Sequence, residues 1–172
     1  HRIRDELEDL SFEILNLDAR KLIQTRLNEI KKDKEDIFEG LSREIKSLLI
    51  DNNINASIYG REKTPFSIWR KLQKKRVSLE NITDIIGFRI ILDNVDSCYK
   101  TLGVLHKKWN CIPGKFKDYI SSPKINGYKS LHTSVIGSYK KPIEIQIRTS
   151  KMHDFAERGI ASHWQYKSSE KF

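Results

Sequence analysis

The chain has 172 residues, enough for one domain with an appended helical segment and for a core that needs no metal or disulfide support. Its 32 lysines and arginines against 23 aspartates and glutamates give a formal net charge of +9, which predicts anionic partners such as nucleotides or nucleic acid. No apolar run is long enough to span a membrane, no signal-peptide segment opens the sequence, and 2 cysteines make neither a disulfide framework nor a four-ligand zinc site. We therefore expect a cytoplasmic chain with reduced thiols.

Helices are predicted at the beginning of the sequence. Apolar residues fall at helical spacing over 5–17, and Asp18 is expected to cap the helix that follows. That second helix keeps an apolar repeat of three and four residues, interrupted at the charged stretch 31–36, where we allow for one break. The segment 51–53 is expected to end it, because Asp and Asn side chains favour turns.

A strand over 56–61 and a helix over 65–73 are predicted next. Basic and hydroxyl side chains gather around the start of this helix, at Arg61, Lys63, Ser67 and Lys71. A solvated helix surface is the ordinary interpretation of such a run, but an arginine beside the turn favours a phosphate site.

The second half of the sequence alternates strands with helices. An apolar strand is predicted within 81–92, with Asp84 at its beginning, where an aspartate is most often a cap. The remaining elements are a helix over 96–108, a strand over 130–136, a hairpin turn over 137–141, a strand over 143–148 and a helix from Thr149 or Ser150 onward. This order predicts an α+β fold with a mixed β-sheet flanked by helices, in which residues 1–53 form an N-terminal helical segment packing on a domain of residues 54–172.

The strand over 143–148 has the most regular pattern in the chain. Its isoleucines point one way into the core, and Glu144, Gln146 and Arg148 point the other way. This polar row is either an exposed sheet face or the wall of a polar site. On the last helix, His153 and Glu157 stand four residues apart without a complete zinc signature, so we interpret them as a satisfied pair.

The stretch 113–133 combines positive charge with aromatic rings. Its 4 lysines and His132 alternate with 2 tyrosines, 2 prolines and 2 glycines, which predicts a loop rather than a buried element. Ammonium groups neutralise phosphate oxygens and a tyrosine ring stacks on a base, so a nucleotide is the first hypothesis for its ligand.

Asp84 and Glu144 are carboxylates at strand positions that would meet if their strands are close in the sheet. Together they would hold Mg²⁺, which takes few carboxylates and completes its shell with water and phosphate. The basic side chains form two clusters on different elements, Arg61/Lys63/Lys71 and Lys117/Lys124/His132. Two clusters indicate two phosphate-bearing substrates, and phosphoryl transfer needs mainly alignment and charge neutralisation. A basic RNA-binding module is the alternative, although it gives no reason for the two carboxylates.

Five motifs resemble, in order, the synthetase domain of the RelA/SpoT (Rel) family of (p)ppGpp alarmone synthetases. They are GREKTPFSIWRKL, ITDIIGFRIIL, KFKDYISSPKINGYKSLHT, IEIQIRT and MHDFAERGIASHWQYK, and they span Tyr59 to Lys167. The N-terminal RDELEDLSFEILN resembles the segment that leads into the synthetase in long, multidomain members. The resemblance implies a nucleotidyltransferase-like fold and transfer of pyrophosphate from ATP to the 3'-hydroxyl of GDP or GTP, with Mg²⁺, in the stringent response.

The resemblance also implies roles for individual residues. Asp84 and Glu144 are expected to hold the metal, with Glu144 also taking the proton of the 3'-hydroxyl. The ATP-binding residues that it implies are Arg61, Lys63, Ser67, Lys71 and Arg89. The residues that it implies for binding GDP or GTP are Lys117, Lys124, Asn126, Tyr128 and His132, with Tyr128 stacked on guanine.

Some features refine the resemblance. The run Lys115 to Asp118 looks like the basic motif of members that combine synthetase and hydrolase activity. Gly87 stands where alanine is common in the family, and Lys115 where arginine is common. The resemblance implies no membrane partner and no direct nucleic-acid contact for this domain, with ribosome or tRNA contacts made through other domains. A synthetase-like domain retained for regulation or assembly is a second alternative.

Overall fold

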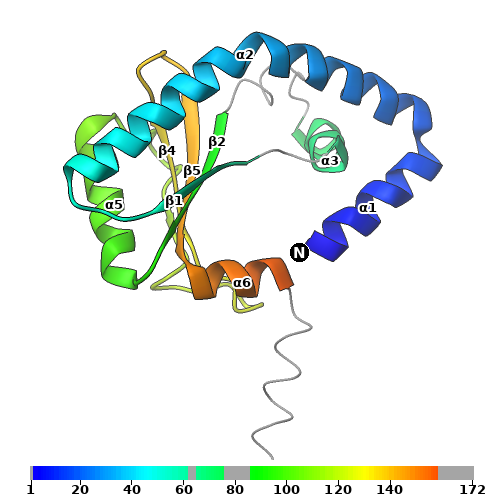
Figure 1. The fold of residues 1–172 in the computed structure, drawn as a ribbon. Coiled ribbons are helices and arrows are strands. Elements are labelled where there is room, and N and C mark those ends of the chain that lie inside the picture. Colours follow the sequence, from blue (N-terminus) through cyan, green and yellow to red (C-terminus); the bar gives the residue numbers. More distant parts are fainter. Residues whose placement is uncertain (1, 62–64, 76–85, 159–172) are drawn as a thin grey trace, which may run out of the picture.

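The computed structural model describes residues 2–61, 65–75 and 86–158 of the chain (Figure 1). The elements in chain order are α1 (Arg2–Leu15), α2 (Leu17–Asp51), β1 (Ser57–Gly60), α3 (Pro65–Lys75), β2 (Ile86–Leu92), α5 (Val95–Lys108), β3 (Lys117–Asp118), β4 (Leu131–Ile136), β5 (Pro142–Thr149) and α6 (Ser150–Arg158). No helix in these ranges combines the length and the apolar character that crossing a membrane requires.

The N-terminal helices differ from the sequence-based expectation in two respects. Helix α2 begins at Leu17 after the cap residue Asn16, so the prediction of Asp18 as the cap is wrong and Asp18 lies in the first turn. The helix continues unbroken for 35 residues, so the break allowed for at 31–36 does not occur. The three lysines and Glu35 of that stretch are good helix formers, so an interrupted apolar repeat does not end the helix. Its predicted end is confirmed, with Asn53 at φ 54°.

The sheet has five strands in the order β1-β2-β5-β4-β3. Strands β2 and β5 are parallel, and the β1·β2, β4·β5 and β3·β4 pairs are antiparallel. The predicted mixed sheet is therefore confirmed, and the two strands expected to carry the carboxylates are neighbours at its centre. The hairpin predicted between β4 and β5 is present, closed by the Gly137 N–H donating to the Lys141 carbonyl at 3.1 Å.

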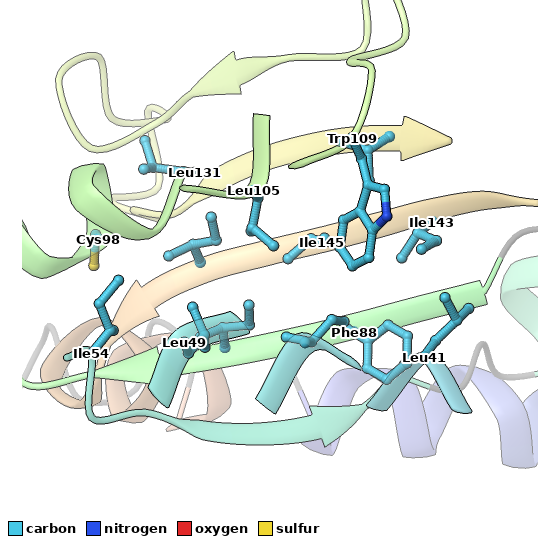
Figure 2. Packing of buried hydrophobic residues seen from close by; sticks show 14 of the residues in the cluster. Leu41, Leu49, Ile54, Phe88, Cys98, Leu105, Trp109, Leu131, Ile143 and Ile145 are labelled. Carbon is cyan, nitrogen blue, oxygen red and sulfur yellow. The ribbon is translucent and has the colours of Figure 1, made fainter. Parts of the chain in front are cut away.

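The main core lies between one face of the sheet and the helices α2 and α5. The predicted apolar faces of β2 and β5 supply fully buried side chains, as does the second half of α2. Figure 2 shows part of this cluster, including Leu41 and Leu49 of α2, Phe88 of β2, Cys98 and Leu105 of α5, Leu131 of β4, and Ile143 and Ile145 of β5. Because strand side chains alternate between the two faces, Arg89 of β2, Glu144 and Gln146 of β5 and His132 of β4 point to the opposite face.

A second, smaller core joins the N-terminal helices to α3. Phe12 of α1, Ile23 of α2 and Ile68 of α3 are buried together. The Phe12 ring lies 5.0 Å from the Trp69 ring and 5.8 Å from the Phe66 ring, measured between centroids. Helix α3 is thereby held against the α1–α2 pair, to one side of the sheet (Figure 1).

Candidate active site

Strand register places polar side chains in rows across the face of the sheet opposite the main core. One row crosses all five strands, with each residue paired to the next, and runs Tyr59, Arg89, Gln146, His132 and Lys117. The adjacent row pairs Gly87 of β2 with Glu144 of β5 and Glu144 with Ser134 of β4. Side chains opposite one another in a sheet point to the same face, so these rows form one surface, which we call the polar face.

Arg61 and Glu144, both predicted as site residues, meet on the polar face. The Arg61 backbone N–H donates to the Gly87 carbonyl at 2.8 Å, which extends the β1·β2 pairing by one residue. Its guanidinium Nη1 lies 3.5 Å from Oε2 of Glu144, and the two side chains are 32% and 31% exposed. A half-buried ion pair at this position keeps both charges accessible to a ligand.

Gly87 lets the Arg61 backbone approach the centre of the sheet. A Cβ atom at this position would lie 2.9 Å from the Arg61 carbonyl oxygen and 3.2 Å from the Arg61 Cβ atom. Ordinary Cβ contacts are longer, so the small residue is what permits this approach. Gly87, which stands where alanine is common in the family, therefore lies in close contact with the Arg61 backbone in this chain.

The other predicted metal ligand, Asp84, lies outside the described residues. Within the described ranges no three His, Cys, Asp or Glu side chains converge as a metal site would require. Glu144 is a partly exposed carboxylate at the end of a parallel strand pair. A single placed carboxylate fits Mg²⁺, which prefers oxygen ligands and usually keeps several waters and substrate phosphates in its shell.

The remaining residues predicted for ATP lie on or before α3 and on β2. Ser67 and Lys71 belong to α3, the helix fixed by the smaller core, and Lys63 lies outside the described residues. Arg89 lies on β2 in the row that crosses the sheet, and its side chain is 25% exposed. The strand register, with the Arg61 N–H bonded to the Gly87 carbonyl, places Arg61 and Arg89 on the same face of the sheet.

The residues predicted for the guanine nucleotide include a compact aromatic cluster. The rings of Tyr119, Tyr128 and His132 meet edge to face, and the Tyr128 hydroxyl lies 2.7 Å from Nε2 of His132. The Lys124 ammonium lies 4.6 Å from the centroid of the Tyr119 ring and 5.1 Å from that of Tyr128. Each of these contacts is in the range of a cation–π interaction, so the ammonium is held over the rings.

Three other features describe how the loop presents this cluster. Tyr128 is 9% exposed, so its ring is largely covered in the structure. The Asn126 side chain accepts a hydrogen bond from the Tyr128 N–H at 3.2 Å, which closes the turn at Gly127, where φ is +77°. Lys117 is exposed on β3 opposite His132. Asn126 thus shapes the loop, whereas Lys117 and Lys124 carry its charge.

His132 is neutral at physiological pH. Burial, and after it the positive charges of Lys124, Arg61 and Arg148, lower the pKa of His132 to about 4, while Glu144 acts in the opposite direction. Lys124 lies in the loop, Arg61 follows β1, and Arg148 and Glu144 lie on β5, so the loop and Arg61 face a common region around His132. A neutral imidazole acts there as a hydrogen-bonding group rather than as a cation.

An ion network that the sequence did not assign lies at the other end of the polar face. Arg148 of β5 is 2% exposed, and its Nη2 lies 2.8 Å from Nδ1 of His153 and 3.4 Å from Oε1 of Glu157. The same Glu157 oxygen lies 3.1 Å from Nη1 of Arg89. The His153–Glu157 pair predicted from their spacing is present at 3.8 Å. The polar row of β5 is not fully open to solvent, since Arg148 is buried and Glu144 is partly buried.

The sequence model of one family matches most of the chain. The family is described as the region found in RelA/SpoT proteins, and its match covers residues 60–171. The chain belongs to the RelA/SpoT family. The match begins at the end of β1, so it includes the whole of the polar face except Tyr59.

Similar proteins support the assignment to the RelA/SpoT family. The chain is 42% identical over 165 residues to the GTP pyrophosphokinase rsh of Brucella melitensis biotype 1, a match that covers 96% of this chain and 22% of that protein. The chain therefore spans about a fifth of the length of such relatives.

Solved structures of small alarmone synthetases share the fold. The crystal structure of small alarmone synthetase 2 from Bacillus subtilis superposes with a TM-score of 0.60 at 30% identity, covering 84% of this chain and 82% of that one. Small alarmone synthetase 1 from the same organism, bound to its product pppGpp, gives 0.57 at 27% identity, with 88% and 84% covered.

Tyr119, Arg148 and Glu157 contact residues of the sequence-based site but were not part of it. Arg148 carried a signal, because it continues the alternating row of Glu144 and Gln146. Glu157 could be found only by knowing that α6 covers this face of the sheet, which is a tertiary relation that no local spacing reveals.

Proposed function

We propose that the chain is a (p)ppGpp synthetase domain that transfers the β,γ-pyrophosphate of ATP to the 3'-hydroxyl of GDP or GTP. The observation that carries the proposal is the polar face, where an accessible carboxylate, Glu144, lies between donor-side arginines and a lysine- and tyrosine-rich loop. Membership of the RelA/SpoT family supports it, as do relatives that are named GTP pyrophosphokinases.

On this proposal the donor nucleotide lies toward β1, β2 and α3. Arg61 and Arg89 bind the triphosphate, with Lys63, Ser67 and Lys71 completing the site. Guanidinium groups form charge-assisted, paired hydrogen bonds with phosphate oxygens, which neutralises the charge that accumulates during transfer. The fixed position of α3 against Phe12 supports this arrangement, because alignment of the phosphates is the main requirement of the reaction.

The acceptor nucleotide lies over the loop and β4. Lys117 and Lys124 bind its phosphates, Tyr128 stacks on guanine, and Asn126 and His132 hold the loop and the ring in place. Because Tyr128 is 9% exposed and Lys124 lies over its ring, binding of guanine requires the Lys124 ammonium to move from the ring toward the phosphates. A cation released from one aromatic face in this way leaves that face open for stacking.

Glu144 lies where the two substrates meet. It takes the proton from the 3'-hydroxyl as that oxygen forms a bond to the β-phosphorus of ATP, and the bond from that phosphorus to the oxygen of AMP breaks. Mg²⁺ held by Asp84 and Glu144 would neutralise charge on the transferred phosphates. The Arg61 guanidinium, 3.5 Å from Glu144, is in reach to orient this carboxylate.

The division of the chain into a helical segment, residues 1–53, and a catalytic domain, residues 54–172, is part of the proposal. Helix α3 packs against Phe12 and Ile23. On this proposal the N-terminal segment therefore holds α3, and with it the ATP site, in place. The second half of α2 also contributes to the main core, so the segment and the domain would depend on one another for stability.

The test of the proposed function is incubation of the chain with ATP and GDP or GTP in the presence of Mg²⁺, followed by separation of the nucleotides. We expect a guanine nucleotide that carries two further phosphates, together with AMP. Glu144→Gln should abolish the transfer with little effect on thermal unfolding, since the amide has the same shape but takes no proton. Full activity of this variant would contradict the role of Glu144, and steeply salt-dependent RNA binding without nucleotide turnover would favour an RNA-binding module.

A further inference from the structure

Arg148 is a buried cation whose charge must be balanced within the protein. It is among the largest fully buried side chains, at 2% exposure, and burial is the first cause that lowers its pKa. Burying an ionised group is costly unless it is paired. A negatively charged partner for Arg148 is therefore a structural requirement of the fold.

Glu157 of α6 supplies the balancing charge, and the same carboxylate oxygen reaches a second arginine. Oε1 of Glu157 lies 3.4 Å from Nη2 of Arg148 and 3.1 Å from Nη1 of Arg89. Arg89 in turn lowers the pKa of Arg148, as expected of two like charges close together. One carboxylate thus holds two guanidinium groups that would otherwise repel each other.

The other contacts of the two arginines increase their dependence on this carboxylate. Arg148 donates to His153, and burial together with the two arginines lowers the pKa of His153, so the imidazole is neutral and offers no charge. In the described part of the chain, the Nε atoms of Arg89 and Arg148 are buried and meet no acceptor. Glu157 is therefore the negative partner that Arg89 and Arg148 share.

We propose that Glu157 is a positioning residue that holds Arg89 in the orientation needed to bind the triphosphate of ATP. This inference rests on the proposed function, in which Arg89 is a donor-side residue. The Arg89 side chain is 25% exposed, so it is accessible to a phosphate while Glu157 anchors it from α6. Two guanidinium groups and one carboxylate leave one net positive charge for the nucleotide.

Without the carboxylate, Arg89 faces the buried charge of Arg148 with no counter-charge between them. Arg89 is the more exposed of the two and would turn toward solvent, away from the polar face. Arg148 would stay, because its surroundings enclose it and it also hydrogen-bonds the Tyr128 side chain. The loss should therefore appear in ATP binding through Arg89, together with a lower thermal stability, because Arg148 stays buried without its counter-charge.

A double-mutant cycle tests this inference on the whole chain. The variants are Glu157→Gln, Arg89→Ala and the two combined, and Asp154→Asn, at an exposed position of the same helix, is the matched control. The measurements are the KM for ATP and kcat, and the calorimetric Kd for α,β-methylene-ATP, which needs no turnover. Thermal unfolding of each variant accompanies them.

We expect Glu157→Gln to weaken binding of the analogue and raise the KM for ATP by about tenfold, the loss of a hydrogen bond between charged groups, with kcat changed less. In the Arg89→Ala background the same change should alter Kd by less than about twofold, since the residue it positions is gone. Asp154→Asn should match the unmodified chain. If Glu157→Gln does not fold, Glu157→Asp retains the negative charge but draws the oxygen back from both arginines, and the same cycle applies.

Several results would overturn the inference. Equal weakening by Glu157→Gln in both backgrounds would show a general structural role, and tighter analogue binding would show that Glu157 competes with phosphate for Arg89. Unchanged binding would remove the role altogether, even in a chain that transfers pyrophosphate normally. Conversely, a chain that binds the analogue with the expected non-additivity but forms no pyrophosphorylated product would uphold this inference and refute the proposed function.

Discussion

His132 predicts a specific dependence of stability on pH. Its pKa is lowered from 6.5 to about 4 by burial and by three nearby positive charges. Because the folded-state pKa lies below the unfolded-state value, the unfolded chain takes up the proton first as the pH falls. The stability that the neutral imidazole contributes is present above pH 6.5 and is lost as the pH falls toward 4.

The size of the effect follows from the two pKa values. Each pKa unit corresponds to about 1.4 kcal/mol, so complete protonation across this window costs about 3 kcal/mol. Between pH 7 and pH 5 the loss is about 2 kcal/mol, because the unfolded imidazole is almost fully protonated at pH 5 and the folded one is not.

The assay is urea unfolding of the chain and of His132→Gln at pH values from 7.5 to 4.5. The glutamine keeps a polar partner for the Tyr128 hydroxyl but has no proton to gain. The difference in unfolding free energy between the two proteins should change by about 2 kcal/mol from pH 7 to pH 5, which isolates His132 from other groups. His106→Gln, which changes a histidine on α5, is the control. Its unfolding free energy should still show the dependence on pH that is due to His132. Parallel curves for the unmodified chain and His132→Gln would refute the burial and charge assignment of His132.

Two further variants test the two sides of the polar face. Tyr128→Ala should raise the KM for the guanine nucleotide more than that for ATP, by an amount equivalent to about 1 to 3 kcal/mol of base stacking, and a larger effect on ATP would reverse the assignment of the two sites. Gly87→Ala should lower stability by about 1 to 3 kcal/mol and raise the KM for ATP, because its Cβ forces the Arg61 backbone away from the sheet. Unchanged unfolding and unchanged KM in Gly87→Ala would contradict the close approach of Arg61.

The sequence predicted the fold well where a single periodicity dominates. The isoleucines of β5 and the apolar side of β2 identified the core face, and the alternation placed Glu144 and Arg148 on the other face. The cap and the break predicted in the N-terminal helix failed because they rest on one or a few residues, whereas the continuity of α2 depends on helix propensity over its whole length.

The site was predictable only in part. The motif residues Arg61 and Glu144 meet across Gly87 of β2, the strand that lies between theirs. The loop residues Lys124, Tyr128 and His132 form one cluster. The pairing of Glu157 with Arg89 could not be read from the sequence, since it depends on how α6 crosses the sheet. Local patterns identify the face that a side chain occupies, and only the tertiary structure identifies what that side chain touches.

The central claim is that the chain joins an ATP pyrophosphate to the ribose 3'-oxygen of a guanine nucleotide. The most direct measurement is phosphorus NMR of the product formed from ATP and GDP with Mg²⁺, with the attachment site read from coupling to the ribose 3' position. We predict a second diphosphate group bonded to the 3'-oxygen, formed in equal amount with AMP and absent with Glu144→Gln. Release of inorganic phosphate or pyrophosphate alone, or extension of the 5'-diphosphate, would contradict the account.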